Sequence, residues 1–361
     1  MPESAVSERA VYRARPTLRI DEREEEQAQE LLIGMTMTER EDGLSAMELR
    51  FSNVASRPDG SADLAFESLG PLQLGTFLSV YAGDEASPQE IFRGQITGLE
   101  GDFPENAPPE LVVLAEDLLQ HARMTRRTKI YEDLTIADLV DTIGRQLHLT
   151  PVVTGMTDTI GTWVQLNESD LAFLRRILAR YDGDVQVVGT ELHVSPRGAV
   201  RRGQIELELH SQLRSARVLA DLAHQVTAVT VTGWNALQGQ RVIGRSQGAE
   251  LGPGSGITGA QMMQRVSIER SEHLGHLAVA THREATALAH AAFDERARRF
   301  VRISGTAEGN PAVRVGTHVA VQGLGPRFDN TYYVVRAVHR YDVVRGYETV
   351  FEGECAYWGA S

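Results

Sequence analysis

The sequence predicts a mainly β protein with α+β inserts, in which two similar antiparallel β-barrel modules follow each other along the chain. A repeated strand pattern is the first observation behind this prediction. Two segments each alternate apolar and polar residues, stop at a Gly-Thr pair and then alternate again. The pairs are Gly75-Thr76, within residues 72–80, and Gly316-Thr317, within residues 313–321.

The strands that follow each Gly-Thr pair are the second observation. Alternating patterns come in the same order after both pairs, at 91–99 and 111–114 in the first copy and at 332–338 and 347–351 in the second. A period of two indicates a strand with one buried face. Gly-Thr between β-branched residues is common enough to match by chance. Three strands repeated in a fixed order favour a duplicated small barrel or sandwich module instead.

Composition bounds the class of protein. A chain of 361 residues is too long for one ordinary core, and we expect several modules. Its 42% hydrophobic and 24% charged residues are typical of a soluble globular protein. The net charge of −13 argues against nucleic-acid binding, which relies on clustered Lys and Arg. The single cysteine, Cys355, excludes an internal disulfide framework and a Cys-rich zinc site.

Targeting signals are the next point. The N-terminus shows no basic stretch followed by an apolar one, and no apolar run approaches the length that spans a bilayer. We therefore expect no signal peptide, no membrane segment and a protein made in the cytoplasm.

The first barrel is predicted at residues 17–118, after a polar N-terminal segment at 1–16. A short strand at 17–20 precedes an acidic run, 21–26, that is typical of a solvated loop or face. Two strands should then lie between 31 and 53, joined by a hairpin turn at Glu41-Asp42-Gly43. Their inner faces are expected to carry Leu31, Ile33, Met35 and Met37 on one strand and Met47, Leu49 and Phe51 on the other.

Residues 119–200 are predicted to form an α+β insert domain. A helix should begin at the N-cap Thr135, with an acid, Asp138, three residues later. A second helix should begin near Ser169-Asp170 and end at Asp182-Gly183. Apolar residues at helical spacing follow both caps: Ile136, Leu139, Val140, Ile143 and Leu147 in the first helix, and Leu171, Leu174, Ile177, Leu178 and Tyr181 in the second. A short strand at 152–153 and a hairpin turning at Gly189-Thr190 complete the domain.

The second barrel is predicted at 201–234 plus 301–355, with strands at 205–209 and 226–231 before the interruption. The interruption, 235–300, is a loop-and-helix insertion. It should contain an exposed Gly-rich loop at 235–265 and an Ala-rich helix at 281–300. Residues 356–361 are expected to be a C-terminal tail.

The serial order of these segments resembles a known family. The resemblance rests on Phe92-Arg93-Gly94-Gln95-Ile96, on 111–117, on 135–143, on the block from Asn167 to Arg176 and on the strands of the second copy. This order is similar to that of the late control D proteins of contractile-tailed phages and of the hub part of the VgrG spikes of type VI secretion. The resemblance covers residues 15–355, and the Glu168-Ser169-Asp170 to Arg176 segment, with Gly183 and the hairpin after it, is its most specific part.

The resemblance implies a structural protein, not an enzyme: the central hub of a baseplate. In that family three copies form a torus, and each supplies two barrels, so that a pseudo-sixfold ring adapts a trimeric spike to a hexameric inner tube. The implied partners are further copies of the chain (a homotrimer), the spike protein, the inner-tube or tube-initiator protein and other baseplate components. The implied location is a virion tail or injection-particle baseplate. No cofactor is implied.

The chain departs from the VgrG pattern at its end. VgrG proteins continue into an oligonucleotide/oligosaccharide-binding-like domain and a β-helical needle, whereas this sequence stops at Ser361. We therefore expect the spike to be a separate protein. Both a phage tail and a phage-like extracellular injection system fit this arrangement.

Three groups of residues are candidates for chemistry. His273, His276 and His282 could form a metal trio, but a zinc site needs ligands that converge from a fixed scaffold, so solvated or packed histidines are favoured. Glu168 with Asp170, or the acids at 24–26, could act as paired carboxylates for glycoside hydrolysis. For Glu168 and Asp170, helix capping is the better account. Cys355 is expected to be packed, and the sequence has no Gly-Lys-Ser/Thr phosphate-loop motif.

The tryptophans are candidate interface residues, because aromatic side chains are enriched at binding hot spots. Core packing is an equal alternative for Trp163 and Trp234. Trp358, in the predicted tail, is the one expected to contact a partner.

Two other functions stay open from the sequence. The first is a tail-associated cell-wall hydrolase or another glycan-acting β-rich enzyme, which would need two acids in a cleft. The second is a small-ligand barrel, although barrels of this size are generally filled by their own side chains.

Overall fold

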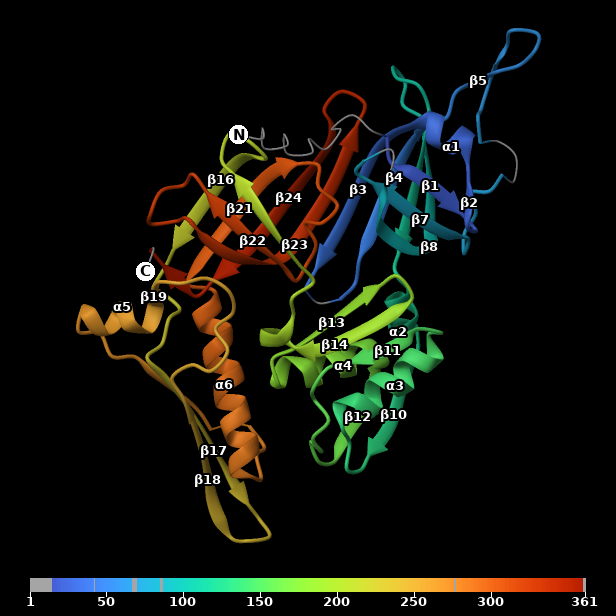
Figure 1. The fold of residues 1–361 in the computed structure, drawn as a ribbon. Helices are drawn as coiled ribbons and strands as arrows, with labels where there is room; N and C mark the ends of the chain where they lie inside the picture. The colour runs from blue at the N-terminus through green and yellow to red at the C-terminus, as the bar shows by residue number, and fades with distance from the viewer. Residues whose placement is uncertain (1–14, 42, 67–69, 85–86, 276, 360–361) are drawn as a thin grey trace.

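The structure is a computed structural model, which describes residues 15–359 except 42, 67–69, 85–86 and 276. Two β modules lie side by side in the upper half of Figure 1, and a mixed α+β part and a long helix beside a β hairpin lie below them. The fold is mainly β with α+β inserts, as predicted.

The two β modules are built from six strands each, in the same spatial order. Across barrel 1 the order is β3-β4-β9-β8-β7-β1, and across barrel 2 it is β16-β21-β24-β23-β22-β15. Neighbouring strands run antiparallel except β15 and β22, which are parallel. Barrel 1 contains β1 (Thr17–Ile20), β3 (Leu32–Arg40), β4 (Ala46–Ser52), β7 (Phe77–Ala82), β8 (Gln89–Asp102) and β9 (Glu110–Glu116). Barrel 2 contains β15 (Gly203–Glu208), β16 (Leu213–Ala220), β21 (Val301–Glu308), β22 (Thr317–Gln322), β23 (Asn330–Asp342) and β24 (Gly346–Cys355). The predicted pair of similar barrels is therefore present.

The Gly-Thr repeat has the same backbone geometry in both barrels. Gly75 and Gly316 have φ angles of +84° and +86°, a region that glycine enters without a steric penalty. The Gly75 amide donates to Ile96 O at 2.8 Å, and the Gly316 amide donates to Val334 O at 3.0 Å. Each glycine thus turns the chain into β7 or β22 and fastens the turn to the next strand, β8 or β23.

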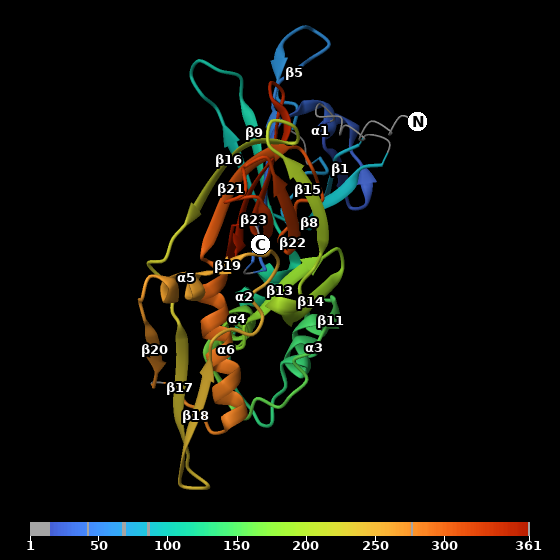
Figure 2. The same cartoon turned by 60° about the vertical axis from the view of Figure 1, so that its left-hand side comes forward.

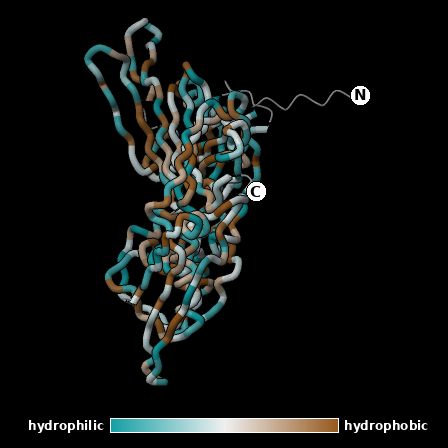
Figure 3. Tube along the Cα trace, turned by 90° about the vertical axis from the view of Figure 1, so that its left-hand side faces the viewer, coloured by the Kyte–Doolittle hydropathy of each residue, from teal (hydrophilic) through white to brown (hydrophobic). Residues whose placement is uncertain are grey.

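One strand pairing joins the two barrels into a continuous sheet. β23 of barrel 2 pairs antiparallel with β3 of barrel 1, from Arg336 opposite Arg40 to Asp342 opposite Gly34. Tyr341 and Tyr347 of barrel 2 also lie within the hydrophobic core of barrel 1. We call this β3–β23 contact the seam. Figure 3 shows hydrophobic residues along the packed strands and hydrophilic ones at the protruding loops.

The α+β insert packs below the seam. Its helices begin at the predicted caps: the Asp138 amide donates to Thr135 Oγ1 at 3.0 Å, and the Ala172 amide donates to Ser169 Oγ at 3.2 Å. The second helix ends earlier than predicted, because the chain turns at Tyr181 and Asp182 has a φ of +52°. The elements are η1 (Leu118–Gln120), α2 (His121–Met124), β10 (Arg126–Tyr131), α3 (Ile136–Gln146), β11 (Thr150–Val153), β12 (Trp163–Ser169), α4 (Asp170–Arg180), β13 (Gly183–Val188), β14 (Glu191–Pro196) and η2 (Arg197–Ala199).

Residues 228–298 form a second inserted unit, which we call the hairpin-helix insertion. The strand predicted at 226–231 exists as β17, but it pairs with β18 and β20 in a separate sheet, not with barrel 2. The barrel strand is β16, which the sequence analysis did not assign. The segment predicted to be a Gly-rich loop also contains two strands and a helix. The elements are β17 (Ala228–Asn235), β18 (Gln240–Ser246), β19 (Ile257–Thr258), α5 (Gly259–Arg265), β20 (Ser271–Leu274) and α6 (His282–Arg298).

Three smaller predictions are corrected by the structure. Leu31 ends a short helix, α1 (Glu26–Leu31), and a bulge shifts the register of β3, so that buried Leu32 takes the inner position expected for Leu31 and Ile33. The acidic run is solvated as predicted, but part of it forms the exposed strand β2 (Arg23–Glu24). The supposed tail contains β25 (Tyr357–Trp358), which pairs with β19. Asp42 of the predicted hairpin turn lies outside the described residues. A further small hairpin consists of β5 (Ala55–Ser56) and β6 (Ala62–Asp63).

Candidate functional site

The seam contains a buried carboxylate, Glu39, that contacts three parts of the chain. Glu39 comes from β3 of barrel 1 and is only 1% exposed. Arg314 of barrel 2 donates to its two oxygens at 2.7 and 2.9 Å, and the Val315 amide donates at 2.9 Å. Gln186 Nε2, from β13 of the α+β insert, donates at 2.6 Å. One side chain therefore connects both barrels to the insert.

Charge balance keeps this group ionised although it is buried. Burial raises the pKa of Glu39, but the Arg314 guanidinium and the hydrogen bonds to the carboxylate outweigh it, so that the pKa lies below its usual value. The neighbouring His339 is also fully buried. Burial, and then the charge of Arg314, lower the pKa of His339 to about 3. The neutral His339 is hydrogen-bonded to Tyr347, with its Nδ1 atom 2.7 Å from the hydroxyl oxygen.

A second cation, Arg197, connects the same three parts. It lies in η2 of the insert and pairs with Glu41, which follows β3. Arg197 Nη2 also donates to Glu354 of β24 at 3.3 Å. Its guanidinium lies 3.8 Å from the ring centroid of Tyr333, a cation–π arrangement. With Glu39 it fixes the insert beneath the seam through charge-assisted bonds.

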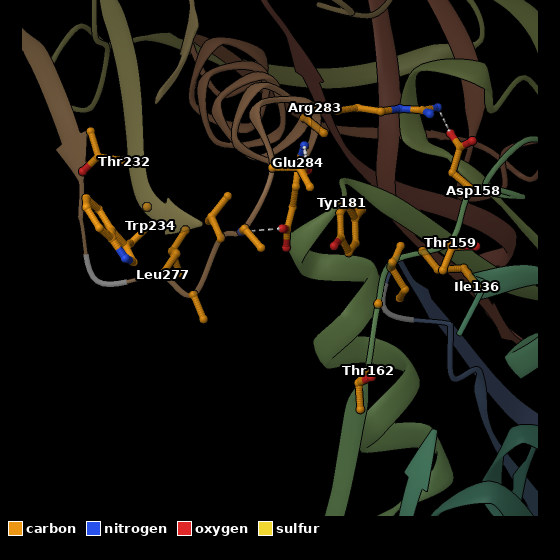
Figure 4. A pocket seen from close by; sticks show the side chains of 18 of the residues that line it. Ile136, Asp158, Thr159, Thr162, Tyr181, Thr232, Trp234, Leu277, Arg283 and Glu284 are labelled. Carbon is orange, nitrogen blue, oxygen red and sulfur yellow. Dashed lines mark hydrogen bonds and ion pairs between the residues drawn. The ribbon is translucent and has the colours of Figure 1, made fainter. Parts of the chain in front are cut away.

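A cleft with a volume of about 1300 Å³ lies between the α+β insert and the hairpin-helix insertion. Figure 4 shows Ile136, Tyr181 and Thr162 on one side of it and Trp234 and Leu277 on the other. Two ion pairs span it: Arg283 with Asp158, and Arg180 with Glu284 at 3.0 Å. These contacts join two units that are far apart in the sequence.

Two of the three histidines considered as metal ligands, His273 and His282, make separate hydrogen bonds. His273 Nε2 lies 2.8 Å from Thr232 Oγ1, and His282 Nδ1 lies 3.0 Å from Ile243 O. His276 lies outside the described residues. Within the described part of the chain, no group of three His, Cys, Asp or Glu residues is placed to hold a metal ion.

The candidate acids are engaged in structural contacts. Glu168 pairs with Arg176 at 2.9 Å. Asp170 accepts from Gln165 Nε2 at 2.9 Å and from Arg127 Nε at 3.1 Å, in the first turn of α4. Cys355 is buried, and burial raises the pKa of its thiol to about 12, so the reactive thiolate is disfavoured.

The three tryptophans lie in different surroundings. Trp163 Nε1 donates to Ile160 O at 2.9 Å within the insert. Trp234 is 61% exposed and lines the cleft, which does not fit core packing. Trp358 lies in β25 and packs against the core of barrel 2. Its expected contact with a partner stays a prediction.

Sequence analysis missed the residues of the seam, although one signal was present. Glu39 continues the inward alternation of Met35 and Met37 along β3. A charged residue at an inward strand position indicates a buried partner, but nothing in the sequence identifies that partner as Arg314. Among the described residues, no helix has the length and apolar character needed to cross a bilayer.

Solved structures of other proteins have a similar fold. This chain is similar to the 43 kDa tail protein of prophage MuSo2 from Shewanella oneidensis, with a TM-score of 0.68, 11% identity and coverage of 95% of this chain and 98% of that one. A tail protein from Neisseria meningitidis MC58 has a TM-score of 0.65 and 10% identity, over 95% and 97% of the two chains. At these identities the likeness shows the fold alone.

A third solved structure comes from a secretion system. The E. coli c3393 protein, described as a component of the type VI secretion system with structural similarity to the T4 tail proteins gp27 and gp5, has a TM-score of 0.58 and 13% identity. The match covers 91% of this chain and 76% of that one. A search of curated proteins gave no match. The family model described as the Alg8 N-terminal domain matches residues 61–342, well over half of the sequence, and the chain therefore belongs to the Alg8 N-terminal domain family.

Proposed function

We propose that this chain is the central hub of the baseplate of a contractile injection apparatus, in a phage tail or a phage-like injection system. The observation that carries the proposal is the pair of barrels with one strand order, joined by the seam into a single sheet. Three such chains would present six similar barrels around a ring. The ring would have threefold symmetry, which matches a trimeric spike, and approximate sixfold symmetry, which matches a hexameric tube.

The solved structures of similar fold support the proposal. Two of them are tail proteins, and the third is described as a type VI secretion component. In this proposal the chain binds a spike protein on one side and the inner-tube or tube-initiator protein on the other. It reaches its place by assembly into a particle, with other baseplate components around it.

The proposed role is structural and not enzymatic. Of the candidate acids for a glycan hydrolase, Glu168 and Asp170 are bound by Arg176, Arg127 and Gln165. We expect the purified chain to release nothing from purified peptidoglycan. Release of soluble fragments, lost on substitution of Glu168 or Asp170, would support the hydrolase instead.

The mass of the purified protein in solution tests the assembly. Light scattering behind a sizing column should give a mass near three times 39.7 kDa, with the spike protein added if it is needed. In the host, deletion of the gene should leave tube and sheath unassembled. Normal particles from a deletion strain would overturn the proposal.

A further inference from the structure

The repeat contains a second pair of strand edges, equivalent to the two that form the seam, and these edges have no partner within the described part of the chain. Strand order makes β16 of barrel 2 the equivalent of β3, and makes β8 of barrel 1 the equivalent of β23. Within the chain, β3 pairs with β23. The described strands provide no corresponding partner for β16 beyond β21, or for the second half of β8 beyond β9.

The free edge of β8 corresponds closely to the edge that β23 uses in the seam. β22 pairs with the first residues of β23, 330–333, and β3 then takes 336–342 on the edge that β22 leaves. In barrel 1, β7 pairs with β8 only as far as Gln95. β8 continues to Asp102, paired with β9 alone. Residues 98–102 thus present the edge that 336–340 present in barrel 2.

The edge of β16 lies at the other end of the sheet. Figure 1 shows β16 at one side of the paired barrels and β8 at the other, and Figure 2 shows the β8–β9 hairpin projecting from the barrels. Leu219 of β16 and Leu99 of β8 are 46% and 40% exposed. Long edges with exposed apolar residues readily pair with another chain, and such pairing is a common mode of protein association.

The repeat fixes a register between these edges. In each barrel, the residue that accepts the hydrogen bond of the turn glycine begins a row of residues that lie opposite one another on successive strands. The row is Ile96, Ala115, Met47, Met37 in barrel 1 and Val334, Gly353, Ile303, Val218 in barrel 2. Met37 and Val218 are therefore equivalent. In the seam, Met37 lies opposite His339, five residues after Val334. The residue five after Ile96 is Gly101, so Gly101 should lie opposite Val218.

We propose that further copies of this chain fill these edges, one copy at each edge, with β8 of one copy pairing antiparallel with β16 of the next. The register places Asp102 opposite Arg217, Glu100 opposite Leu219 and Leu99 opposite Ala220. Asp102 and Arg217 have opposite charges, and neither makes an ion pair within the described part of the chain. Directly opposed residues of opposite charge stabilise a strand pair.

The contact is heterologous, because β8 and β16 are different surfaces. A heterologous contact repeated around an axis closes into a ring when the rotation permits it. Around the ring, the β3–β23 seam within each chain would then alternate with a β8–β16 contact between neighbouring chains. This inference rests on the proposed hub function and identifies how its copies join.

Engineered cysteines test the register in the full-length protein. Glu100→Cys and Leu219→Cys in one chain should oxidise to covalent trimers, and Leu99→Cys with Ala220→Cys should do the same. Mixing the two single variants of a pair should give disulfide-linked dimers only. The native Cys355 is 1% exposed and can stay in place.

The outcomes separate this inference from the hub function. A trimer by light scattering that forms none of these disulfides would overturn the β8–β16 pairing and leave the hub function standing. Disulfide dimers from Leu219→Cys alone would indicate a symmetric β16–β16 contact and would also overturn it. A chain that stays monomeric with the spike protein present, and forms no disulfides, would contradict both proposals.

Charge reversal provides a second, independent test. Asp102→Arg alone and Arg217→Asp alone should each lower the fraction of trimer, whereas the double variant should restore it. The matched control is Arg245→Asp, an exposed strand arginine in the hairpin-helix insertion. If the double variant assembles no better than either single variant, Asp102 and Arg217 do not face each other.

Discussion

At the scale of single residues, Glu39 makes the seam depend on one charge. The Glu39→Gln substitution keeps the shape of the side chain but leaves the partly buried Arg314 guanidinium without the carboxylate that it pairs with. Loss of one partner of a buried ion pair typically costs about 3–5 kcal/mol. The free energy of unfolding, measured in urea, should fall by an amount of that order.

A solvent-facing pair in barrel 1 supplies the control for this variant. Arg50 and Glu110 bond at 2.6 Å on the surface, and Glu110→Gln should cost less than about 1 kcal/mol. Equal losses in the two variants would contradict the role assigned to Glu39.

His339 makes the stability of the seam depend on pH. The pKa of His339 is about 3 in the folded protein and 6.5 in a free side chain. Unfolding below pH 6.5 therefore takes up a proton that the folded protein excludes. The His339 contribution to stability is fully present above pH 6.5 and is lost as the pH falls toward 3, with a slope of about 1.4 kcal/mol per pH unit. Denaturant titrations at several pH values measure this slope.

The variant His339→Gln isolates that slope from the titration of other groups. The difference in unfolding free energy between wild type and variant should narrow as the pH falls from 6.5. A difference that stays constant with pH would show that His339 is protonated equally in the folded and unfolded states.

At the scale of elements, the two Gly-Thr turns share a conformation but differ in their surroundings. Both glycines have positive φ, which costs a residue with a Cβ about 1–2 kcal/mol. A Cβ on Gly75 would meet open space, whereas a Cβ on Gly316 would come within 2.7 Å of Arg202 and Val200 atoms. Gly75→Ala should therefore cost about 1–2 kcal/mol and Gly316→Ala distinctly more, as measured by thermal unfolding. Equal costs would mean that the barrel 2 turn relaxes freely.

Element by element, the sequence predicted what local chemistry determines. The caps at Thr135 and Ser169 and the apolar stripes behind them formed as expected, because the signal lies within one helix. β17 was assigned to barrel 2 because its alternation does not show which sheet it joins. β16 was missed because, as a sheet edge with exposed Arg214, Arg217 and Leu219, it lacks a clean apolar face. The seam itself depends on pairing between residues about 300 positions apart, which no local pattern reveals.

At the scale of the whole molecule, ion pairs across the cleft connect the α+β insert to the hairpin-helix insertion. Glu284, at the start of α6, accepts from Arg180 of the insert at 3.0 Å and from its own Ala280 amide at 3.1 Å. Glu284→Gln removes the charge from that bridge. Hydrogen exchange of the cleft-lining segment 277–284 should become faster, with little change in the barrels.

The same helix offers a control for the cleft variant. Glu295 pairs with Arg299 four residues later, at an exposed position about three turns further along α6 than Glu284. Glu295→Gln should leave exchange at 277–284 unchanged. Faster exchange in both variants would point to a general loosening of α6 and not to the bridge.

The placement of Tyr341 and Tyr347 in the core of barrel 1 has a consequence for synthesis on the ribosome. Chains emerge N-terminus first, and domains generally fold as they appear. Barrel 1 is nearly complete by Glu116, yet its core and the outer edge of β3 stay unfilled until the last strands have been made. The nascent chain must therefore carry an unfinished barrel through most of its translation. A stop codon after barrel 1 would release a protein with an open core, so the first half of the duplication depends on the second half for its own folding.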